Sequence, residues 1–320
     1  MTMTAPTLLL RHVDLFDTKN AISMKYSSLS GLSMLRVMYK HNNNPFTDYP
    51  LGNVMNRDSK ELLIIVISAI VVVAVVMSAL MLYSGMSRPL TVVESKSMQH
   101  SDTTSYLGII DTGDMVVMIS PDKRTPTTYV EGYQNGHCSF GSYGDVIIYY
   151  RGNGQNPVIH RAIIWLDYND GVISAPSLKD YPADKWSNEG TWDNLIGDLV
   201  LKDLPYKDGS RDVTMDLTRV THEGYLTMGD NNGYFDQMSM THPEPVMKSE
   251  LKAIAGIEIP WLGCIKLLIN NKNTSMIPDN SLNCLLILVL DIIAFFSVAI
   301  VTTEYVIRHR DIKNNEETIE

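Results

Sequence analysis

Two long apolar runs divide the chain, and the first extends from Leu62 to Tyr83. It contains no charged residue and is interrupted only by Ser68 and Ser78. At about 1.5 Å per helical residue the run reaches about 33 Å, enough to cross the roughly 30 Å hydrocarbon core of a bilayer. It starts too far from Met1, and is too long, for a cleaved signal peptide. The pattern therefore predicts a transmembrane helix.

The second apolar run, from Leu282 to Val301, carries Asp291 at its centre. A mid-membrane acid costs about 2.5–3.5 kcal/mol on insertion scales, and the surrounding Leu, Ile, Phe and Val residues outweigh that cost. Two readings of Asp291 stay open: the helix tolerates it, or it contacts another helix or a lipid headgroup. Two spans put both tails on one side of the membrane and residues 84–281 on the other. Basic residues after the second span favour a cytosolic C-terminus.

Between the spans the chain alternates short β-branched and aromatic runs with turn signals. The expected strands are Thr91–Glu94, Met115–Ile119, Val146–Tyr150, Val158–Leu166, Tyr225–Met228 and Ala253–Ile259. Glycine-rich turns such as Gly152-Asn153-Gly154 separate them. There is no alternation of strands with helices. The pattern predicts a mainly β fold, in which a coiled or barrel-like antiparallel sheet is flanked by two transmembrane helices.

The remaining segments complete the predicted organisation. Residues 1–61 show no sustained periodicity and are expected to form a loosely structured cytosolic tail. Residues 302–320 are expected to form a second cytosolic tail. Within the extracytoplasmic domain over 84–281, residues 174–223 turn polar, with Trp and Pro interspersed. They predict an inserted subregion, which either covers the site or decorates one edge of the sheet.

Charge and cysteine content narrow the class of protein. The chain has a net charge of −10, and residues 84–281 contain 25 acidic residues against 16 Lys and Arg. Such a surface argues against nucleic acid as a partner and fits a domain facing an extracytoplasmic medium. Three cysteines give no disulfide framework. Cys284 lies in the second span, and a pairing of Cys138 with Cys264 stays open.

A serine, a histidine and an aspartate follow the first span in an order that suggests nucleophilic catalysis. Ser97 lies just past the span, and His160 and Asp236 follow it along the chain. A serine hydroxyl becomes a good nucleophile when a histidine removes its proton during attack. An aspartate on the far nitrogen of the histidine fixes its tautomer and stabilises the imidazolium. Spacing alone is weak support, because a chain of this size offers many such trios.

The sequence around these residues resembles type I signal peptidases of the archaeal and endoplasmic-reticulum branch. The matching blocks are Ser95-x-Ser97-Met98-x-His100, Gly144-Asp145-Val146-Ile147 with His160-Arg161-Ala162, Gly229-Asp230-Asn231-Asn232 with Asp236, and more weakly Ile259-Pro260-Trp261-Leu262-Gly263. Together they cover the segment between the spans in family order. The combination is specific, although any single block would not be.

The resemblance implies a role for each matched residue. Ser97 is the implied nucleophile, His160 the general base in place of the lysine of the bacterial branch, and Asp236 the orienting acid. Asp230 is implied as an auxiliary acid in the turn. One departure is that the stretch from His160 to Asp230 is longer than expected for the family. His100 is a poorer candidate for the base, expected to pack beside the nucleophile loop.

The implied activity is that of a membrane-bound serine endopeptidase that removes signal peptides after small residues at the cut site. It requires neither a cofactor nor a metal, and His137 with Cys138 lacks partners at metal-ligand spacing. Expected partners are signal-peptide-bearing preproteins and the lipid bilayer, with the protein-export channel as a further candidate. The expected location is the cell membrane, with the catalytic domain extracytoplasmic.

Two alternatives remain open at the level of sequence. The first is a catalytically idle homologue that serves as a membrane-tethered binding subunit; loss of a triad residue would indicate it, and none is lost here. The second is a protease of the same fold that is specialised for a narrow set of surface-protein precursors. The residues do not separate these substrate ranges.

Overall fold

The computed structural model of the chain describes residues 57–151, 156–206, 209–239 and 243–317. The chain divides into two units between residues 66 and 67, within helix α1 (Arg57–Ser84). The tail expected over 1–61 lies outside the described residues as far as residue 56. The second unit contains all the strands described below.

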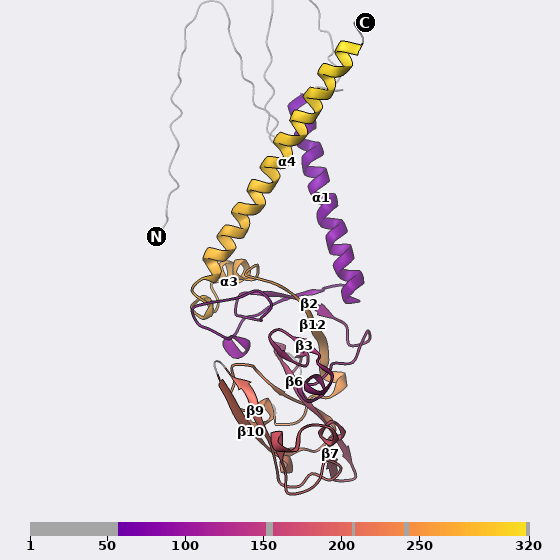
Figure 1. Cartoon of the computed structure of the whole chain (residues 1–320), viewed down its shortest axis with the longest axis vertical. Coiled ribbons are helices and arrows are strands. Elements are labelled where there is room, and N and C mark those ends of the chain that lie inside the picture. The colour runs from indigo at the N-terminus through magenta and orange to yellow at the C-terminus, as the bar shows by residue number, and fades with distance from the viewer. Residues whose placement is uncertain (1–56, 152–155, 207–208, 240–242, 318–320) are drawn as a thin grey trace, which may run out of the picture. The chain divides into compact units, whose positions relative to one another are not determined.

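An antiparallel sheet forms the centre of the second unit (Figure 1). Among the described residues, seven strands belong to it, in the order β1-β2-β12-β5-β6-β11 with β7 paired to β6. Their bounds are β1 Leu90–Val92, β2 Met115–Ile119, β5 Val146–Tyr149, β6 Val158–Asn169, β7 Val172–Ser174, β11 Gly224–Met228 and β12 Leu251–Ile259. The mainly β, antiparallel prediction is confirmed, and each of the six expected strands overlaps one of these.

The sheet buries its central strands on both faces. Every residue of β5 is buried, because β12 and β6 flank it and side chains pack above and below. The pairing of β11 with β6 contains a bulge between Leu226 and Thr227. Beyond that bulge β11 ends at Met228, opposite Arg161. The chain therefore leaves the sheet beside the N-terminal half of β6, which carries His160.

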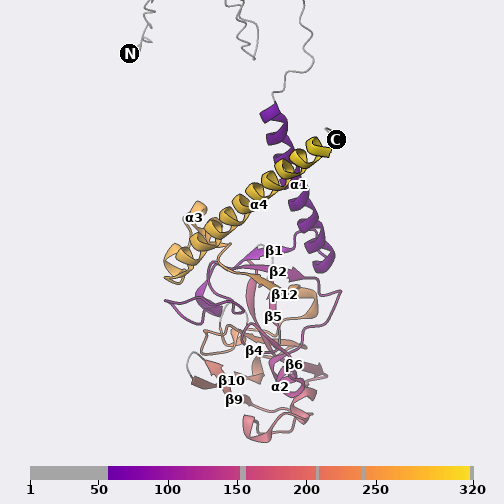
Figure 2. The same ribbon diagram turned by 45° about the horizontal axis from the view of Figure 1, so that its top comes forward.

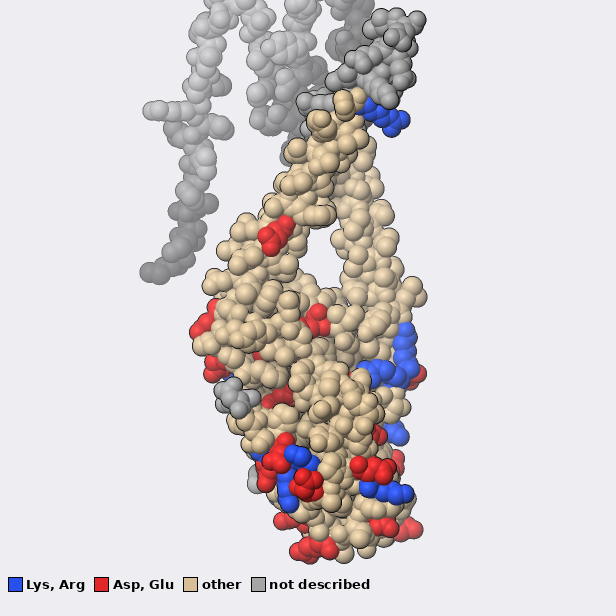
Figure 3. Space-filling view, in the orientation of Figure 1, with Lys and Arg blue, Asp and Glu red and all other residues tan. Residues whose placement is uncertain are grey.

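Two helices are long and apolar enough to cross a membrane, as the sequence predicts. They cover Leu63–Ser84 in α1 and Ser281–Thr303 in α4 (Ser281–Glu317). The apolar stretches of both helices are almost free of Lys, Arg, Asp and Glu, whereas charges are spread over the β region (Figure 3). Helix α4 continues to Glu317, so the described part of the second expected tail is helical.

The end of α1 is fastened to the turn that follows β2. Lys123 Nζ donates to the carbonyl oxygens of Leu82 and Tyr83, at 2.5 and 2.9 Å. The backbone N–H of Ser120 donates to the carbonyl of Ser84 at 2.8 Å. These bonds satisfy carbonyls that the last helical turn leaves without intrahelical partners.

Shorter helices and strands complete the β region. They are α2 (Tyr129–Asn135), α3 (Cys264–Asn270), β3 (Cys138–Ser139) and β4 (Ser142–Tyr143). Helix α3 contacts α4 at its start (Figure 2). A capping box between Thr128 and Glu131 starts α2. All three cysteines are free, with Cys138 exposed and Cys264 buried, so the possible pairing of these two does not form.

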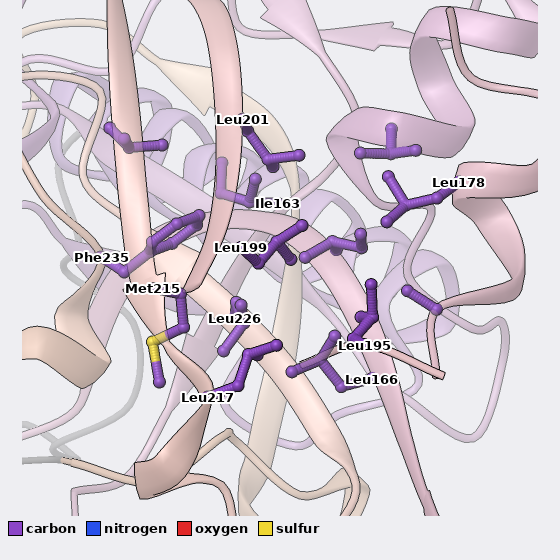
Figure 4. Packing of buried hydrophobic residues seen from close by; sticks show 14 of the residues in the cluster. Ile163, Leu166, Leu178, Leu195, Leu199, Leu201, Met215, Leu217, Leu226 and Phe235 are labelled. Carbon is purple, nitrogen blue, oxygen red and sulfur yellow. The ribbon is translucent and has the colours of Figure 1, made fainter. Parts of the chain in front are cut away.

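The expected insertion over 174–223 forms a sheet of its own. Its strands are β8 (Trp186–Ser187), β9 (Asp198–Tyr206) and β10 (Gly209–Asp216), in the order β10-β9-β8. Leu199, Leu201 and Met215 from this sheet share one buried cluster with Ile163, Leu226 and Phe235 (Figure 4). The subregion is therefore more than an edge decoration, because it completes the hydrophobic core behind β6 and β11.

This shared core predicts that the insertion and the main sheet unfold together. Leu201→Ala should lower the free energy of unfolding by about 2–5 kcal/mol, because Leu201 is fully buried and its loss leaves a cavity. Denaturation of the purified full-length chain, followed by tryptophan fluorescence, measures the effect. The matched control is Ile196→Ala in the same subregion, where the side chain is half exposed and the change should stay within about 0.5 kcal/mol. A separate early transition confined to the insertion would contradict the prediction.

Candidate active site

His160 and Asp236 form a buried hydrogen-bonded pair. His160 is the third residue of β6, and Asp236 opens the 3₁₀ helix η5 (Asp236–Met238). Nδ1 of His160 lies 2.5 Å from Oδ2 of Asp236, and the two side chains are 3 and 4% exposed. Because an ionised carboxylate can only accept, Nδ1 carries a hydrogen, and in the neutral imidazole Nε2 is then left with its lone pair. This is the tautomer in which Nε2 can accept a proton.

The Asp236 carboxylate is held in its charged form despite its burial. Burial acts to raise the pKa of the Asp236 carboxyl. The charge of His160 and hydrogen bonds from His160, Thr227 and Tyr149 outweigh it and hold that pKa below its usual value. Asp236 is therefore negative at neutral pH and can stabilise a protonated His160.

Ser97 occupies the middle of the 3₁₀ helix η1 (Lys96–Met98), which follows β1 after a short extended segment. Its backbone is tied to the turn that follows β11. The backbone N–H of Asn231 donates to the Ser97 carbonyl at 2.8 Å, and Asn231 Nδ2 donates to the Lys96 carbonyl at 2.9 Å. The Ser95 and Ser97 hydroxyl oxygens lie 3.1 Å apart, within hydrogen-bond distance. The two bonds from Asn231 thus fix the position of η1 relative to the turn after β11.

Gly229 marks the place where the Ser97 segment meets His160. A Cβ atom at position 229 would lie 3.0 Å from Nε2 of His160 and would collide with the Ser97 carbonyl oxygen. The segment η1 also contacts β6 directly. The structure therefore places the backbone of the Ser97 segment beside Nε2 of His160, while Asp236 binds Nδ1; the Ser97 hydroxyl itself lies within hydrogen-bond distance of Ser95. Only glycine leaves room for this approach.

Asp230 lies in the same turn but is engaged on the other side of β6. Arg161 binds it through two bonds, Nε to Oδ1 at 2.9 Å and Nη2 to Oδ2 at 2.6 Å. Arg161 is almost completely buried. Its Nη1 also donates to the carbonyls of Ser139 and Gly144, each at 3.0 Å. Asp230 thus neutralises a buried guanidinium and anchors the turn, instead of contacting His160.

The other two candidate histidines are placed apart from this pair. His100 Nε2 lies 3.9 Å from Asp230 Oδ2, so His100 sits beside the nucleophile loop, as expected. His137 Nε2 lies 2.9 Å from Oδ1 of Asp145, which Arg124 also binds. Within the described part of the chain, no group of three or more His, Cys, Asp or Glu side chains is placed to hold a metal ion.

Several residues of the cluster do not stand out in the sequence. Gly229 and Asn231 belong to the Gly-Asp-Asn-Asn block, but only the three-dimensional structure shows that they lie next to the backbone of Ser97. Tyr149 and Thr227 look like ordinary strand residues. Their inward position depends on the sheet register, including the bulge at Leu226 and Thr227.

A second group of buried carboxyls lies between η1 and β12. Asp111 and Asp114 are buried in the loop before β2, and the half-buried Glu258 comes from β12. Burial raises the pKa of Asp114 to about 7, and burial with the nearby charge of Asp114 raises that of Glu258 to about 8. The Asp111 side chain accepts from the His100 backbone N–H at 3.1 Å. This bond links the group to the segment that follows η1.

These raised pKa values predict that the fold loses stability as the pH rises. A carboxyl whose pKa is higher when folded contributes most below its unfolded value, and that contribution is lost as the pH climbs through the folded value. The melting temperature of the purified protein should therefore fall between about pH 5 and about pH 8. Glu258→Gln should flatten the fall, because one titrating group is removed. A melting temperature that rises over this interval would contradict the prediction.

Comparison of the chain with models of known protein families and with curated protein sequences finds no match. A function can therefore be inferred only from the geometry of the cluster and from the two long apolar helices that flank the β domain. That geometry combines a hydroxyl, an imidazole in the accepting tautomer and a buried carboxylate. Such a set is suited to acyl transfer through a serine nucleophile.

Proposed function

We propose that the protein is a membrane-bound serine endopeptidase that removes signal peptides from exported preproteins. The observation that carries the proposal is the buried His160–Asp236 pair, whose free Nε2 faces the segment of Ser97. The His160–Asp236 pair and the Ser97 segment lie in a domain that begins a few residues after a helix long enough to span a membrane. The sequence blocks that resemble the signal peptidases contain these same three residues.

In the proposed reaction Ser97 Oγ attacks the scissile carbonyl carbon while its proton passes to Nε2 of His160. The tetrahedral intermediate collapses when Nε2 returns that proton to the leaving amine, and the carbon–nitrogen bond breaks. The signal peptide is then held as an ester on Ser97. A water molecule repeats the same steps and frees the enzyme. Backbone amides near Ser97 would hold the oxyanion during both attacks.

Asp236 supports both halves of the reaction without exchanging a proton itself. Its bond to Nδ1 keeps Nε2 free to accept, and its charge stabilises the imidazolium that forms during attack. Water is largely excluded, since both side chains are almost fully buried. The attraction between them is therefore screened less than it would be at the surface.

The distance of the serine from the span suits a substrate that stays in the membrane. Only residues 85–89 separate α1 from β1, and η1 follows a few residues later. We place residues 84–281 on the extracytoplasmic side of the cell membrane, with both tails in the cytosol. The hydrophobic part of a signal peptide would then remain in the bilayer while its cleavage site reaches Ser97. Val93 and Met98, on either side of Ser97 in the sequence, belong to a buried apolar cluster against which Ile159 packs.

The first test of the proposal concerns the nucleophile. Ser97→Ala should reduce turnover by several orders of magnitude, on the order of 10⁶ if the three residues act as a unit. The assay uses the protein in liposomes with a synthetic preprotein, and sequencing of the new N-terminus locates the cut.

The matched control for the nucleophile is Ser95→Ala. It removes only the hydroxyl that neighbours Ser97 Oγ, so most of the activity should remain. Equal losses in the two variants would mean that the nucleophile is wrongly assigned or that the two serines share its role. A wild-type protein that leaves all preproteins uncut would overturn the proposal itself.

A second test separates the two aspartates of the turn. Asp236→Asn should lower kcat by about 10⁴, because the tautomer of His160 is no longer fixed. Asp230→Asn should cost much less activity and appear mainly as a lower melting temperature, since Arg161 is left buried without its charged partner. Kinetics and thermal denaturation of both variants provide the comparison. An inactive Asp230→Asn beside an active Asp236→Asn would reverse the assignment.

A further inference from the structure

Oδ2 of Asp236 accepts hydrogen bonds from three different strands. His160 Nδ1 approaches from β6 at 2.5 Å, the Tyr149 hydroxyl from β5 at 2.8 Å and the Thr227 hydroxyl from β11 at 2.7 Å. Tyr149 and Thr227 are completely buried. The bonds from the two hydroxyls are therefore protected from competition with bulk water.

The neighbouring Gln237 sets the direction of the Thr227 hydroxyl. Its Oε1 accepts the backbone N–H of Thr227 at 3.0 Å, so its Nε2 faces the threonine oxygen at 3.2 Å and donates to it. The single hydrogen of Thr227 is then left for Asp236. The Tyr149 hydroxyl also lies 3.0 Å from Thr227 Oγ1, and its own hydrogen serves Asp236 in the same way. The network thus presents two neutral donors to one carboxylate oxygen.

Neutral donors have an effect that a second cation would not have. They replace the water that a buried carboxylate loses, so that Asp236 stays ionised, and they bring no charge that would repel an imidazolium at His160. They also hold the carboxylate from two sides, which fixes its angle to Nδ1.

We propose that Tyr149 and Thr227 are positioning residues that keep Asp236 ionised and aimed at His160, and so set the acid limit of catalysis. The kinetic part of this inference rests on the proposed peptidase function. The ionisation of the pair does not, and it can be measured in the absence of any substrate.

No charged side chain other than His160 is bonded to the Asp236 carboxylate among the described residues. Strand β10 packs against η5, but its charged side chains bond elsewhere. Arg211 donates to the Asp230 carbonyl, Asp212 accepts from the Asp203 backbone N–H, and Asp216 accepts from Thr218. From β5 the titratable group is Tyr149 itself, whose pKa burial holds well above its usual range. Tyr149 therefore stays protonated and acts as a donor.

The test removes each hydroxyl with little change in shape, through Tyr149→Phe and Thr227→Val. Loss of a donor makes the His160–Asp236 pair bind its extra proton more tightly, whichever partner holds it. The acid limb of the pH profile of kcat/KM should move to higher pH by about one unit in each variant, the shift for a hydrogen bond of usual strength to a charged group. A purely structural role would instead lower kcat equally at all pH values.

Two controls separate the hydroxyls from packing. Tyr225→Phe removes another buried tyrosine hydroxyl, one on β11 that packs against Trp165, and it should leave the acid limb in place. Thr227→Ser keeps the donor while deleting a methyl group, and it should retain the wild-type limb. If Thr227→Val is too unstable to purify, the comparison of Tyr149→Phe with Tyr225→Phe still decides the question.

A readout without substrate distinguishes failure of this inference from failure of the proposed function. In proton NMR spectra of the purified chain, the His160 Nδ1–H signal reports the bond to Asp236, and the His160→Ala variant assigns it. The pH below which that signal changes should rise in Tyr149→Phe and Thr227→Val and stay constant in Tyr225→Phe. Unchanged titration in both hydroxyl variants would overturn the inference even if the peptidase assay succeeds. A shifted titration would support it even if no preprotein is cut.

Discussion

The alternation of side chains along β6 is the constraint on which the candidate site depends. His160 and Arg161 are consecutive, so they lie on opposite faces of the sheet, and each binds one aspartate of the segment after β11. Asp236 is held on one face and Asp230 on the other. The segment 229–236 is thereby fixed at two points that straddle a single strand. Because Asn231 lies between them and binds the backbone of Ser97, the position of the serine follows from the same constraint.

The burial of Arg161 requires that its ion pair and its hydrogen bonds form together. A guanidinium that is almost fully buried is costly unless nearly every donor is satisfied. Here the Asp230 carboxylate and the backbone carbonyls of the β3–β4 hairpin meet that need. Loss of Asp230 would leave a buried guanidinium without its charged partner and destabilise the fold.

The insertion between His160 and Asp230 has a related role. It lies between β6 and the turn that begins at Gly229, and its leucines complete the core on which Phe235 packs. Phe235 directly precedes Asp236, so the packing of a distant subregion fixes the start of η5. Arg211 of β10 adds weaker contacts to the carbonyls of Gly229 and Asp230. The inserted subregion thus packs against the segment that carries Asp236.

The sequence was sufficient for features that depend on local pattern. Apolar length predicts both helices that are long and apolar enough to cross a membrane, and β-branched runs between turns predict the six strands. The trio of Ser97, His160 and Asp236 follows from motif context, and the structure brings these residues together while their roles stay predictions. Contacts that arise only from register escape such reasoning. The Tyr149 and Thr227 hydroxyls meet Asp236 because three strands align, and the sheet over 186–216 is polar on its outer side and apolar toward a core that local sequence does not reveal.

Two sets of buried carboxyls show that neighbouring charges and hydrogen-bond donors, and not burial alone, decide the charge of an acid in this domain. Asp236 is almost fully buried, yet the charge of His160 and hydrogen bonds from His160, Thr227 and Tyr149 hold its pKa below the usual value. Burial is the largest cause of the raised pKa values of Asp114 and Glu258; the charge of Asp111 adds to the rise for Asp114, and the charges of Asp114 and Asp111 add to it for Glu258. The first set loses its charge only at low pH, and the second gains charge only toward neutral and higher pH. Raising the pH therefore adds negative charge at Asp114 and Glu258, whereas the charge of Asp236 changes only when the pH is lowered.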